Sequence, residues 1–401
     1  MRVAVLAWGL PPHGSGLGRA AMEIARGLSQ LGCDVTLFDS GRALGETVVQ
    51  SGLAVVGCAP PTNGFAGFLR KRAVIGHLVA PWYFCKALRE VHRECPFSIV
   101  EATNWYAPAA FLTTGSPALV VRNSTPAIDA KKENLSLRQR IDLWFAHKLE
   151  KQTAKKAAAL ISNTPSHAQV IKDIYNIADQ PIHEVISLAL DEDVLKRGAA
   201  APLPSVKAAP SLLFVGRAER RKGFSEMLAG YACANQARRK VGRRPIRLTI
   251  VGVEPVDVTE CLKAQGEDLS LCNEIEILNG LSDDDLYAEY EGTTAVIAPS
   301  RYESFGLVYR EAAAFGRPLI ACREDPAACD FIDTAECGIL ADTCTPKAIA
   351  DAIERLFETP DDWDKFALAG RRHVQSLTVK RLAAKTLEVY AGVIALRSSV
   401  G

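Results

Sequence analysis

One local pattern occurs twice in this chain and constrains its fold more than any other feature: an apolar strand, a glycine-containing loop and an amphipathic helix. Residues 2–8 predict a buried strand, a glycine-rich loop ends at Gly16, and apolar residues then recur at helical spacing up to Gly32. A second strand at residues 35–38 completes a strand–helix–strand unit. Such a unit requires a parallel sheet.

The pattern restarts after residue 211. We expect further strands, separated by helices such as 224–238, at 212–215, 247–251, 275–278, 295–298 and 318–321. Residues 196–211 contain three prolines and no apolar period, which indicates a linker. The sequence therefore predicts an α/β protein with two Rossmann-like parallel-sheet domains, 1–195 and 212–378, whose sheet edges face a central cleft.

Composition excludes some classes of protein. The 401 residues are 48% hydrophobic and 23% charged, as in ordinary globular proteins, and none of the eleven cysteines forms a CxxC pair. Residues 1–200 carry 22 basic and 17 acidic side chains, and the remainder carry 25 and 29. The apolar run 73–85 is too short to cross a bilayer, and the first residues lack the apolar stretch of a signal peptide. We expect a cytoplasmic protein with no nucleic-acid partner.

The strongest chemical signal lies at residues 300–312. Glu303 falls in the loop after the strand at 295–298, and Glu311 lies about one turn inside the following helix. Free amides at the start of that helix form an anion site, and a carboxylate one turn deeper can accept hydrogen bonds from two sugar hydroxyls. On spacing alone, acidic residues that stabilise the helix dipole explain the pattern equally well.

A second signal follows the strand at 212–215. In the turn from Gly216 to Gly223, Arg217 and Lys222 suit a diphosphate, because Arg offers a planar donor fork and Lys a point charge. A solvated basic turn is the alternative, and we assign Arg220 and Arg221 to it. The small residues of the loop at Gly16 would let backbone approach a phosphate or a sugar.

Together these motifs resemble the retaining GT-B glycosyltransferases of glycosyltransferase family 4. The resemblance covers nearly the whole chain and rests on Ser-x-x-Glu-Ser-Phe-Gly-Leu at 300–307, Glu-Ala-x-Ala-x-Gly-x-Pro at 311–318 and Gly-Arg-x4-Lys-Gly at 216–223. It implies a hexosyltransferase that moves a sugar from a UDP-, GDP- or ADP-sugar to an acceptor hydroxyl. Because the basic residues and helix amides already suit the phosphates, we expect no metal or other cofactor. The resemblance further implies that the last helix, from about 379 to 401, packs back on the first domain.

The resemblance also implies a role for each site residue. Glu311 would bind the ribose hydroxyls and Glu303 the donor sugar, with Glu303, Arg217 and Lys222 forming the catalytic set. The remaining donor-binding positions are backbone groups: Phe305 and Gly306 toward the sugar, Leu307 and Val308 toward the phosphate, Leu281 at the base, and Gly16 at the diphosphate from the other domain.

Two segments depart from the family pattern. Many members have a histidine in the stretch that here reads Val-Val-Arg-Asn-Ser-Thr-Pro at 120–126, where Ser124 takes its place beside Asn123 on the acceptor side. Serine cannot act as an acid or base near neutral pH, although it can bind a sugar hydroxyl. Residues 322–326 lack the usual pair of glycines. The acceptor stays unidentified.

Alternatives remain open. An epimerase-like GT-B enzyme or a non-catalytic nucleotide-sugar-binding protein would share the fold, and the scattered histidines predict no metal site. The basic stretch 70–72 before Trp82, and Lys148, Lys151, Lys155 and Lys156, allow weak contact with the inner face of a membrane. A solvated face or the wall of an acceptor cleft explains them as well.

Overall fold

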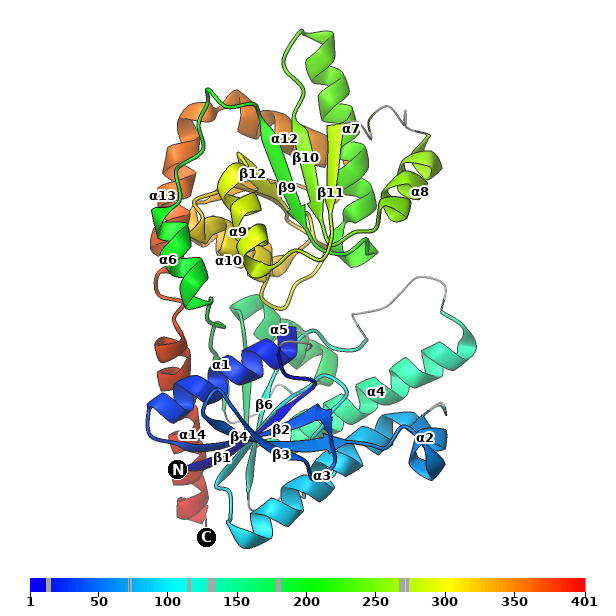
Figure 1. Ribbon diagram of the computed structural model, residues 1–401, viewed down its shortest axis with the longest axis vertical. Helices are drawn as coiled ribbons and strands as arrows, with labels where there is room; N and C mark the ends of the chain where they lie inside the picture. Colours follow the sequence, from blue (N-terminus) through cyan, green and yellow to red (C-terminus); the bar gives the residue numbers. More distant parts are fainter. Residues whose placement is uncertain are drawn as a thin grey trace. The chain divides into compact units, whose positions relative to one another are not determined.

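The computed structural model describes residues 1–11, 16–70, 72, 74–113, 117–128, 135–177, 182–266, 271 and 274–400. The chain divides into two compact units (Figure 1). Unit 1 comprises Met1–Ala189 and Val379–Gly401, and unit 2 comprises Leu190–Thr378. The last helix thus returns to unit 1.

The boundary between the units lies earlier than the segment predicted as a linker. The helix α6 (Glu192–Ala200) belongs to unit 2 and occupies the first part of 196–211. Val194 and Gly198 are buried, and a Cβ on Gly198 would lie 2.5 Å from the carbonyl oxygen of Ala314. The predicted linker was therefore wrong in part, because this close approach of backbones escapes a search for apolar periods.

Unit 1 contains an eight-stranded sheet of order β3-β4-β2-β1-β5-β6-β7-β8, in which only the β3–β4 pair is antiparallel. Its strands are β1 (Arg2–Ala7), β2 (Asp34–Ala43), β3 (Thr47–Gln50), β4 (Leu53–Ala59), β5 (Ile99–Thr103), β6 (Ala118–Arg122), β7 (Ala159–Ser162) and β8 (His183–Val185). Its helices are α1 (Gly16–Gln30), α2 (Gly64–Arg70), α3 (Gly76–Glu94), α4 (Leu137–Lys156), α5 (Pro165–Tyr175) and α14 (Val379–Val400).

Both faces of this sheet are covered, which explains why β1 is continuously apolar. Val3 and Val5 contribute to a core under α1 and α14, whereas Ala4 and Leu6 point to the opposite core with α3, α4 and α5. The contact between α1 and α14 is close, since a Cβ on Gly27 would lie 2.7 Å from that of Ala383.

Unit 2 contains six parallel strands in the order β11-β10-β9-β12-β13-β14. They are β9 (Ser211–Val215), β10 (Arg247–Val251), β11 (Ile275–Leu278), β12 (Ala295–Ile297), β13 (Leu319–Cys322) and β14 (Gly338–Ala341), which confirms all five strands predicted here. The helices after α6 are α7 (Phe224–Lys240), α8 (Pro255–Gln265), α9 (Asp283–Gly292), α10 (Leu307–Ala314), α11 (Pro326–Ala335), α12 (Pro346–Glu358) and α13 (Trp363–Val374).

The strand order places one switch point in each sheet. The chain runs outward from β9 in one direction to β10 and β11, and from β12 in the other to β13 and β14. In unit 1 the corresponding neighbours are β1 and β5. Ligands of open α/β sheets bind outside the carboxyl ends of such neighbouring strands. No helix in the described part of the chain combines the length and apolar character needed to cross a membrane.

Candidate active site

The loop between β12 and α10 lies at the switch point of unit 2. Its last residue, Gly306, has a φ of 73°, and a Cβ there would lie 2.3 Å from Cδ2 of Tyr309, so only glycine fits. Gly306 is also the N-cap of α10 and supplies no side-chain cap. The first-turn amides of α10, including those of Leu307 and Val308, therefore have no capping side chain and suit an anion.

Glu303 lies in this loop among positively charged groups from the turn after β9. Its Oε1 accepts hydrogen bonds from Nζ of Lys222 at 2.6 Å and Oγ of Ser300 at 2.9 Å, and its Oε2 lies 3.1 Å from Nη1 of Arg221. Burial alone would raise the pKa of Glu303, but the charges of Lys222 and Arg221 outweigh burial and lower it. Glu303 is therefore a carboxylate at neutral pH.

The structure places two arginines of this turn differently from the sequence prediction. Arg217 has 71% of its side chain exposed and pairs with Glu219 at 2.9 Å, away from Glu303. Arg221, assigned above to a solvated turn, is 17% exposed and also donates to the carbonyl oxygen of Tyr302 at 3.0 Å. The prediction for Arg221 was wrong. The 3-10 turn Arg220–Lys222 ends at Gly223, whose φ of 63° turns the chain into α7.

Glu311 lies within α10, as predicted. Its Oε2 accepts a hydrogen bond from the hydroxyl of Tyr290 at 2.9 Å, and the Tyr290 ring stacks on Phe315. This anchor fixes the Glu311 carboxylate. Leu281 lies in the turn after β11, partly buried against the same core.

Arg310 is a site residue that the sequence analysis missed. It is buried, stacks on Phe305 at 4.1 Å and on Phe331 at 4.3 Å, and donates to the carbonyl oxygens of Phe305 and Gly306. Burial lowers the pKa of Arg310 to about 10, still well above neutral pH. Arg310 thus holds the two residues that precede α10. The sequence offers no signal for it, because Arg310 stands directly before Glu311 and has the pattern of an ordinary polar helix position.

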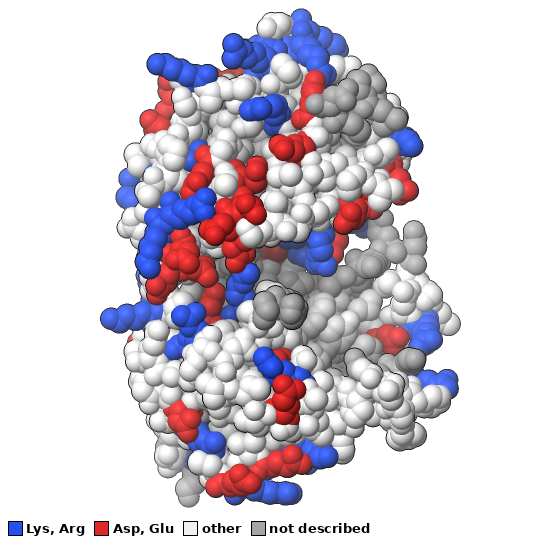
Figure 2. Space-filling model, in the orientation of Figure 1, with Lys and Arg blue, Asp and Glu red and all other residues white. Residues whose placement is uncertain are grey.

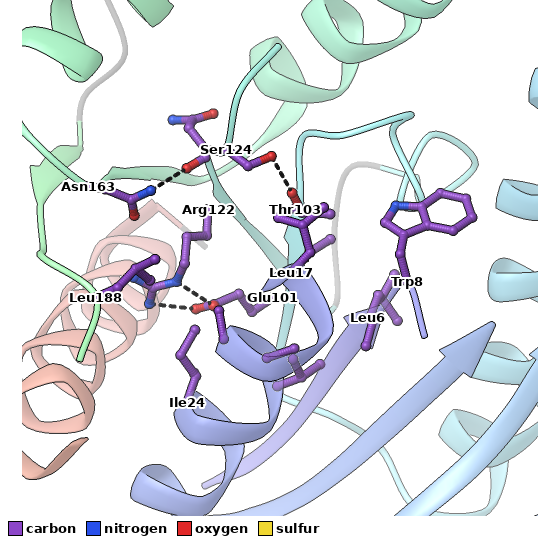
Figure 3. Close-up of a pocket in the computed structure, with 16 residues that line it drawn as sticks. Leu6, Trp8, Leu17, Ile24, Glu101, Thr103, Arg122, Ser124, Asn163 and Leu188 are labelled. Atoms are coloured by element: carbon purple, nitrogen blue, oxygen red, sulfur yellow. Dashed lines mark hydrogen bonds and ion pairs between the residues drawn. The ribbon is translucent and has the colours of Figure 1, made fainter. Parts of the chain in front are cut away.

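Unit 1 has its own pocket at its switch point, a cavity of about 50 Å³ lined by the ends of β1, β5 and β6 and by the start of α1 (Figure 3). The guanidinium of Arg122 pairs with both oxygens of Glu101, at 2.8 and 3.3 Å. Thr386 and Tyr390, both on α14, complete the pair through hydrogen bonds of 2.8 and 2.6 Å. The two charges are therefore fixed in the wall of the cavity.

Asn123 and Ser124, predicted on the acceptor side, both line this cavity. The Ser124 hydroxyl lies 3.1 Å from that of Thr103 (Figure 3). It also donates to Oδ1 of Asn104 at 3.0 Å. The amide of Asn163 donates to the carbonyl oxygen of Asn123 at 3.2 Å. Ser124 is thus engaged within the protein.

Three buried polar atoms around the cavity have no hydrogen-bond partner among the described residues. They are Nη1 of Arg122, Oδ1 of Asn123 and Oδ1 of Asn163. Unpaired buried polar groups carry a free-energy cost, so a ligand or water that pairs with them is favoured. One donor and two acceptors suit the hydroxyls of a polar ligand. Gly16 begins α1 nearby, and no atom of the described residues lies within 4 Å of the position its Cβ would take. Gly14 and Ser15 lie outside the described residues.

Three Asp-x-Asp triplets, Asp191–Asp193, Asp283–Asp285 and Asp362–Asp364, begin helices of unit 2, so the prediction of no metal site cannot rest on the absence of that motif. In Asp191–Asp193 the first carboxylate caps α6 by accepting the Asp193 amide, and in Asp283–Asp285 the middle carboxylate pairs with Arg197. Nowhere in the described ranges do three His, Cys, Asp or Glu side chains gather to hold a metal ion.

Comparison with known proteins identifies the family. Residues 200–373 match the glycosyl transferases group 1 and residues 14–193 match Glycosyltransferase Family 4. The chain belongs to glycosyltransferase family 4. It is a glycosyltransferase that uses a nucleotide sugar.

Individual relatives agree with this assignment. The D-inositol 3-phosphate glycosyltransferase of Nocardiopsis dassonvillei is 25% identical over 96% of this chain and 91% of its own length. Further relatives with that name are 26–30% identical but are covered over only 48–59% of their length.

Solved structures share the fold over nearly the whole chain. Sucrose-phosphate synthase from Thermosynechococcus elongatus superposes with a TM-score of 0.75 at 19% identity, over 99% of this chain and 100% of that one. HepE from Anabaena, in complex with UDP and glucose, superposes with a TM-score of 0.68 at 14% identity, over 98% and 99%. The fold is therefore GT-B, as predicted.

Proposed function

We propose that this glycosyltransferase transfers a hexosyl group to an acceptor hydroxyl with retention of the anomeric configuration and without a metal ion. The observation that carries the proposal is the cluster of Glu303, Lys222 and Arg221 beside the uncapped start of α10. A carboxylate for sugar hydroxyls and positive groups for phosphate thereby meet at one switch point. The Anabaena neighbour's complex with UDP and glucose supports a nucleoside diphosphate and a hexose as ligands.

In this proposal the donor binds along unit 2. Glu311 accepts the ribose hydroxyls, Glu303 contacts the sugar, and the backbone at Leu281 receives the base. The amides from Phe305 to Val308 face sugar and phosphate. Lys222 stabilises the diphosphate, with Arg221 as the nearer arginine and Arg217 as one that would have to move from its exposed position. Gly16 is proposed to approach the diphosphate.

The reaction breaks the bond between the anomeric carbon and the phosphate oxygen. Negative charge grows on the leaving diphosphate, and fixed positive groups lower the energy of that transition state more than that of the ground state. The acceptor hydroxyl attacks the same face of the sugar and gives its proton to the leaving phosphate. No separate protein base is needed, which is compatible with Ser124 in place of histidine.

The cavity of unit 1 is the proposed acceptor site. Arg122, Asn123 and Asn163 present one donor and two acceptors that have no partner among the described residues, and a hydroxyl can pair with either kind. D-inositol 3-phosphate, after which the relatives are named, is the first acceptor to test.

A turnover assay separates the proposal from its alternatives. UDP-, GDP- and ADP-sugars are first screened by thermal shift, since a ligand at 100 times its Kd stabilises by about 2.7 kcal/mol. The selected donor is then incubated with and without acceptor. Release of nucleoside diphosphate only with acceptor, and a product with the donor's anomeric configuration by NMR, supports the proposal. Release without acceptor indicates an epimerase-like enzyme, and binding without turnover a non-catalytic protein.

We further propose that unit 1 docks on an anionic lipid surface through a face formed by α2, the start of α3 and α4. The exposed side chains of α4 include an apolar stripe at helical spacing, Leu137, Ile141 and Trp144, with Lys148 one turn further on. The exposed fractions of Leu137 and Trp144 are 73% and 59%. An apolar helix face that none of the described residues of unit 1 covers needs another partner.

The charges on α4 favour an anionic partner. Its two carboxylates are engaged within unit 1: Glu150 is fully buried, and Asp142 accepts the Val74 amide at 2.7 Å. Lys148 lies over the Trp144 ring at 5.1 Å, so cation and indole share one surface. On unit 2, by contrast, Figure 2 shows basic side chains next to acidic ones on the visible face.

Neighbouring helices extend this face. Phe65 and Phe68 on α2 are exposed, with Arg72 over the Phe68 ring at 4.2 Å, and Trp82 on α3 is exposed with Lys86 at 5.9 Å. Aromatic rings beside basic residues are typical of proteins that lie in a lipid interface. Of the predicted basic stretch, Lys71 and the side chain of Arg70 lie outside the described residues.

Flotation with vesicles tests the lipid surface. We expect the protein to bind phosphatidylglycerol-containing vesicles better than phosphatidylcholine vesicles, and Trp144→Ser with Lys148→Glu to abolish the difference. The matched control, Leu368→Ser with Lys240→Glu, changes an exposed leucine and lysine of unit 2 and should bind normally. Equal binding by both double variants, or a wild-type dimer that Trp144→Ser dissociates, would overturn the lipid assignment.

A further inference from the structure

Asp325 is a fully buried carboxylate directly beneath the Glu303 loop. It is the N-cap of α11, and its Oδ1 accepts the Ala327 amide at 3.1 Å. It belongs to the segment 322–326 that lacks the family's pair of glycines. Its side chain makes contacts that a glycine in this segment could not make.

The Asp325 carboxylate also contacts residues of the candidate active site. The same Oδ1 accepts the backbone amide of Glu303 at 2.9 Å, and Oδ2 accepts the hydroxyl of Tyr309 at 2.6 Å. Tyr309 is itself buried in α10 and also donates toward the carbonyl oxygen of Ala298 at the end of β12. One carboxylate thus connects the starts of α10 and α11 to the backbone of the loop that carries Glu303.

The electrostatic surroundings make this carboxylate unusual. Burial, and to a lesser degree the nearby Glu303 carboxylate, raise the pKa of Asp325 to about 7, against hydrogen bonds from Tyr309 and from the two amides, which lower it. The groups that face Asp325 are Glu303 on its loop, Tyr309 and Arg310 on α10, and Cys329 on α11. Lys222 and Arg221 lie beyond Glu303 and pair with it.

We infer that Asp325 is a positioning residue that holds the Glu303 backbone and so fixes where the Glu303 carboxylate meets the donor sugar. The inference rests on the role proposed for Glu303. Lys222, Arg221 and Ser300 hold the carboxylate end of Glu303, whereas Asp325 holds its main chain from the opposite side. A displacement of about 1 Å at a reacting group can cost about 100-fold in rate.

Two variants of Asp325 separate positioning from helix capping. Serine also caps a helix, but its hydroxyl is one bond shorter than the carboxylate and should no longer reach the Glu303 amide. Asparagine keeps the oxygen that accepts both amides. Asp191→Ser is the matched control, because Asp191 caps α6 and accepts the amide two residues on, as Asp325 does in α11.

Donor kinetics and calorimetry with the nucleoside diphosphate and the nucleotide sugar provide the readout. We expect Asp325→Ser to lower kcat by about 10- to 100-fold. The variant should bind the nucleotide sugar more weakly and the nucleoside diphosphate as tightly as the wild type does. Asp325→Asn should recover most of kcat while losing the ionisation near pH 7 from the kcat profile, and Asp191→Ser should match the wild type.

The kinetics of the Asp325 and Glu303 variants distinguish failure of the inference from failure of the proposed function. If Asp325→Ser keeps the wild-type kcat while Glu303→Gln loses it, Asp325 only caps α11 and the inference fails. If Glu303→Gln itself keeps wild-type kcat, the proposed role of Glu303 fails first. If Asp325→Ser does not fold, Tyr309→Phe removes the bond to Oδ2 and leaves the cap. An unchanged kcat and nucleotide-sugar affinity in Tyr309→Phe would then overturn the inference.

Discussion

Replacement of Lys222 by methionine tests the proposed catalysis most directly. The substitution removes the ammonium that lies 2.6 Å from Oε1 of Glu303 and keeps a stem of similar length. Removal of one fixed stabiliser of transition-state charge costs about 2.7–4 kcal/mol, or about 100- to 1000-fold in rate. We expect kcat to fall by about this factor, and the KM for donor to rise less.

The same substitution affects Glu303. A hydrogen bond to a charged group contributes about 1.5–3 kcal/mol to stability. Arg221 and Ser300 still contact the Glu303 carboxylate in the variant, so only part of its stabilisation is lost. Of the two positive charges that lower the pKa of Glu303, Lys222 has the larger effect, so its loss should raise that pKa. The acid limb of the kcat profile should therefore move to higher pH.

Steady-state kinetics at varied donor and pH, with thermal unfolding in parallel, provide the measurement. Lys240→Met is the matched control, because Lys240 is an exposed lysine at the far end of α7, the helix that Lys222 precedes. An unchanged kcat with only a raised KM would mean that Lys222 binds substrate and transition state equally. A lower melting temperature with unchanged kinetics would make Lys222 a structural partner of Glu303 alone.

Four further outcomes are expected. By calorimetry, Glu311→Ala should weaken the binding of both nucleoside diphosphate and nucleotide sugar by about 1.5–3 kcal/mol, whereas Glu303→Ala should weaken only the binding of the nucleotide sugar. Equal losses of affinity in both variants for both ligands would refute the division of roles. Arg217→Ala should reduce kcat less than Arg221→Ala, because Arg217 is exposed and paired with Glu219; the reverse order would show that Arg217 moves onto the donor. EDTA should leave turnover unchanged, and loss of activity that manganese restores would overturn the metal-free mechanism. Burial lowers the pKa of His183 to about 4, so the unfolded state binds more protons than the folded state between about pH 4 and 6.5. The free energy of unfolding should therefore fall as the pH drops through that window. Urea unfolding of His183→Gln should show a smaller loss of stability over the same window.

The sequence by itself determined the local elements and the positions of the chemical motifs. Apolar runs ended by Gly or Pro fixed β9, β10 and β11 to within a residue, because strand and helix periods are local properties of the chain. Glu303 in a loop and Glu311 inside a helix also followed from local spacing. The family motif added the prediction of a donor site, which the pattern alone left open.

The tertiary structure decided which side chains meet. The pairing of β9 with β12 brings the turn at Arg220–Lys222 to the Glu303 loop across about 80 residues of chain, and the turn's geometry selects Arg221 over Arg217. Asp325 reaches Glu303 only because β13 lies beside β12. Strand neighbours far apart in sequence are set by packing of the whole sheet, so no local pattern encodes these contacts. The boundary at 189–190 has the same cause, since α6 is held by a close backbone contact with the end of α10.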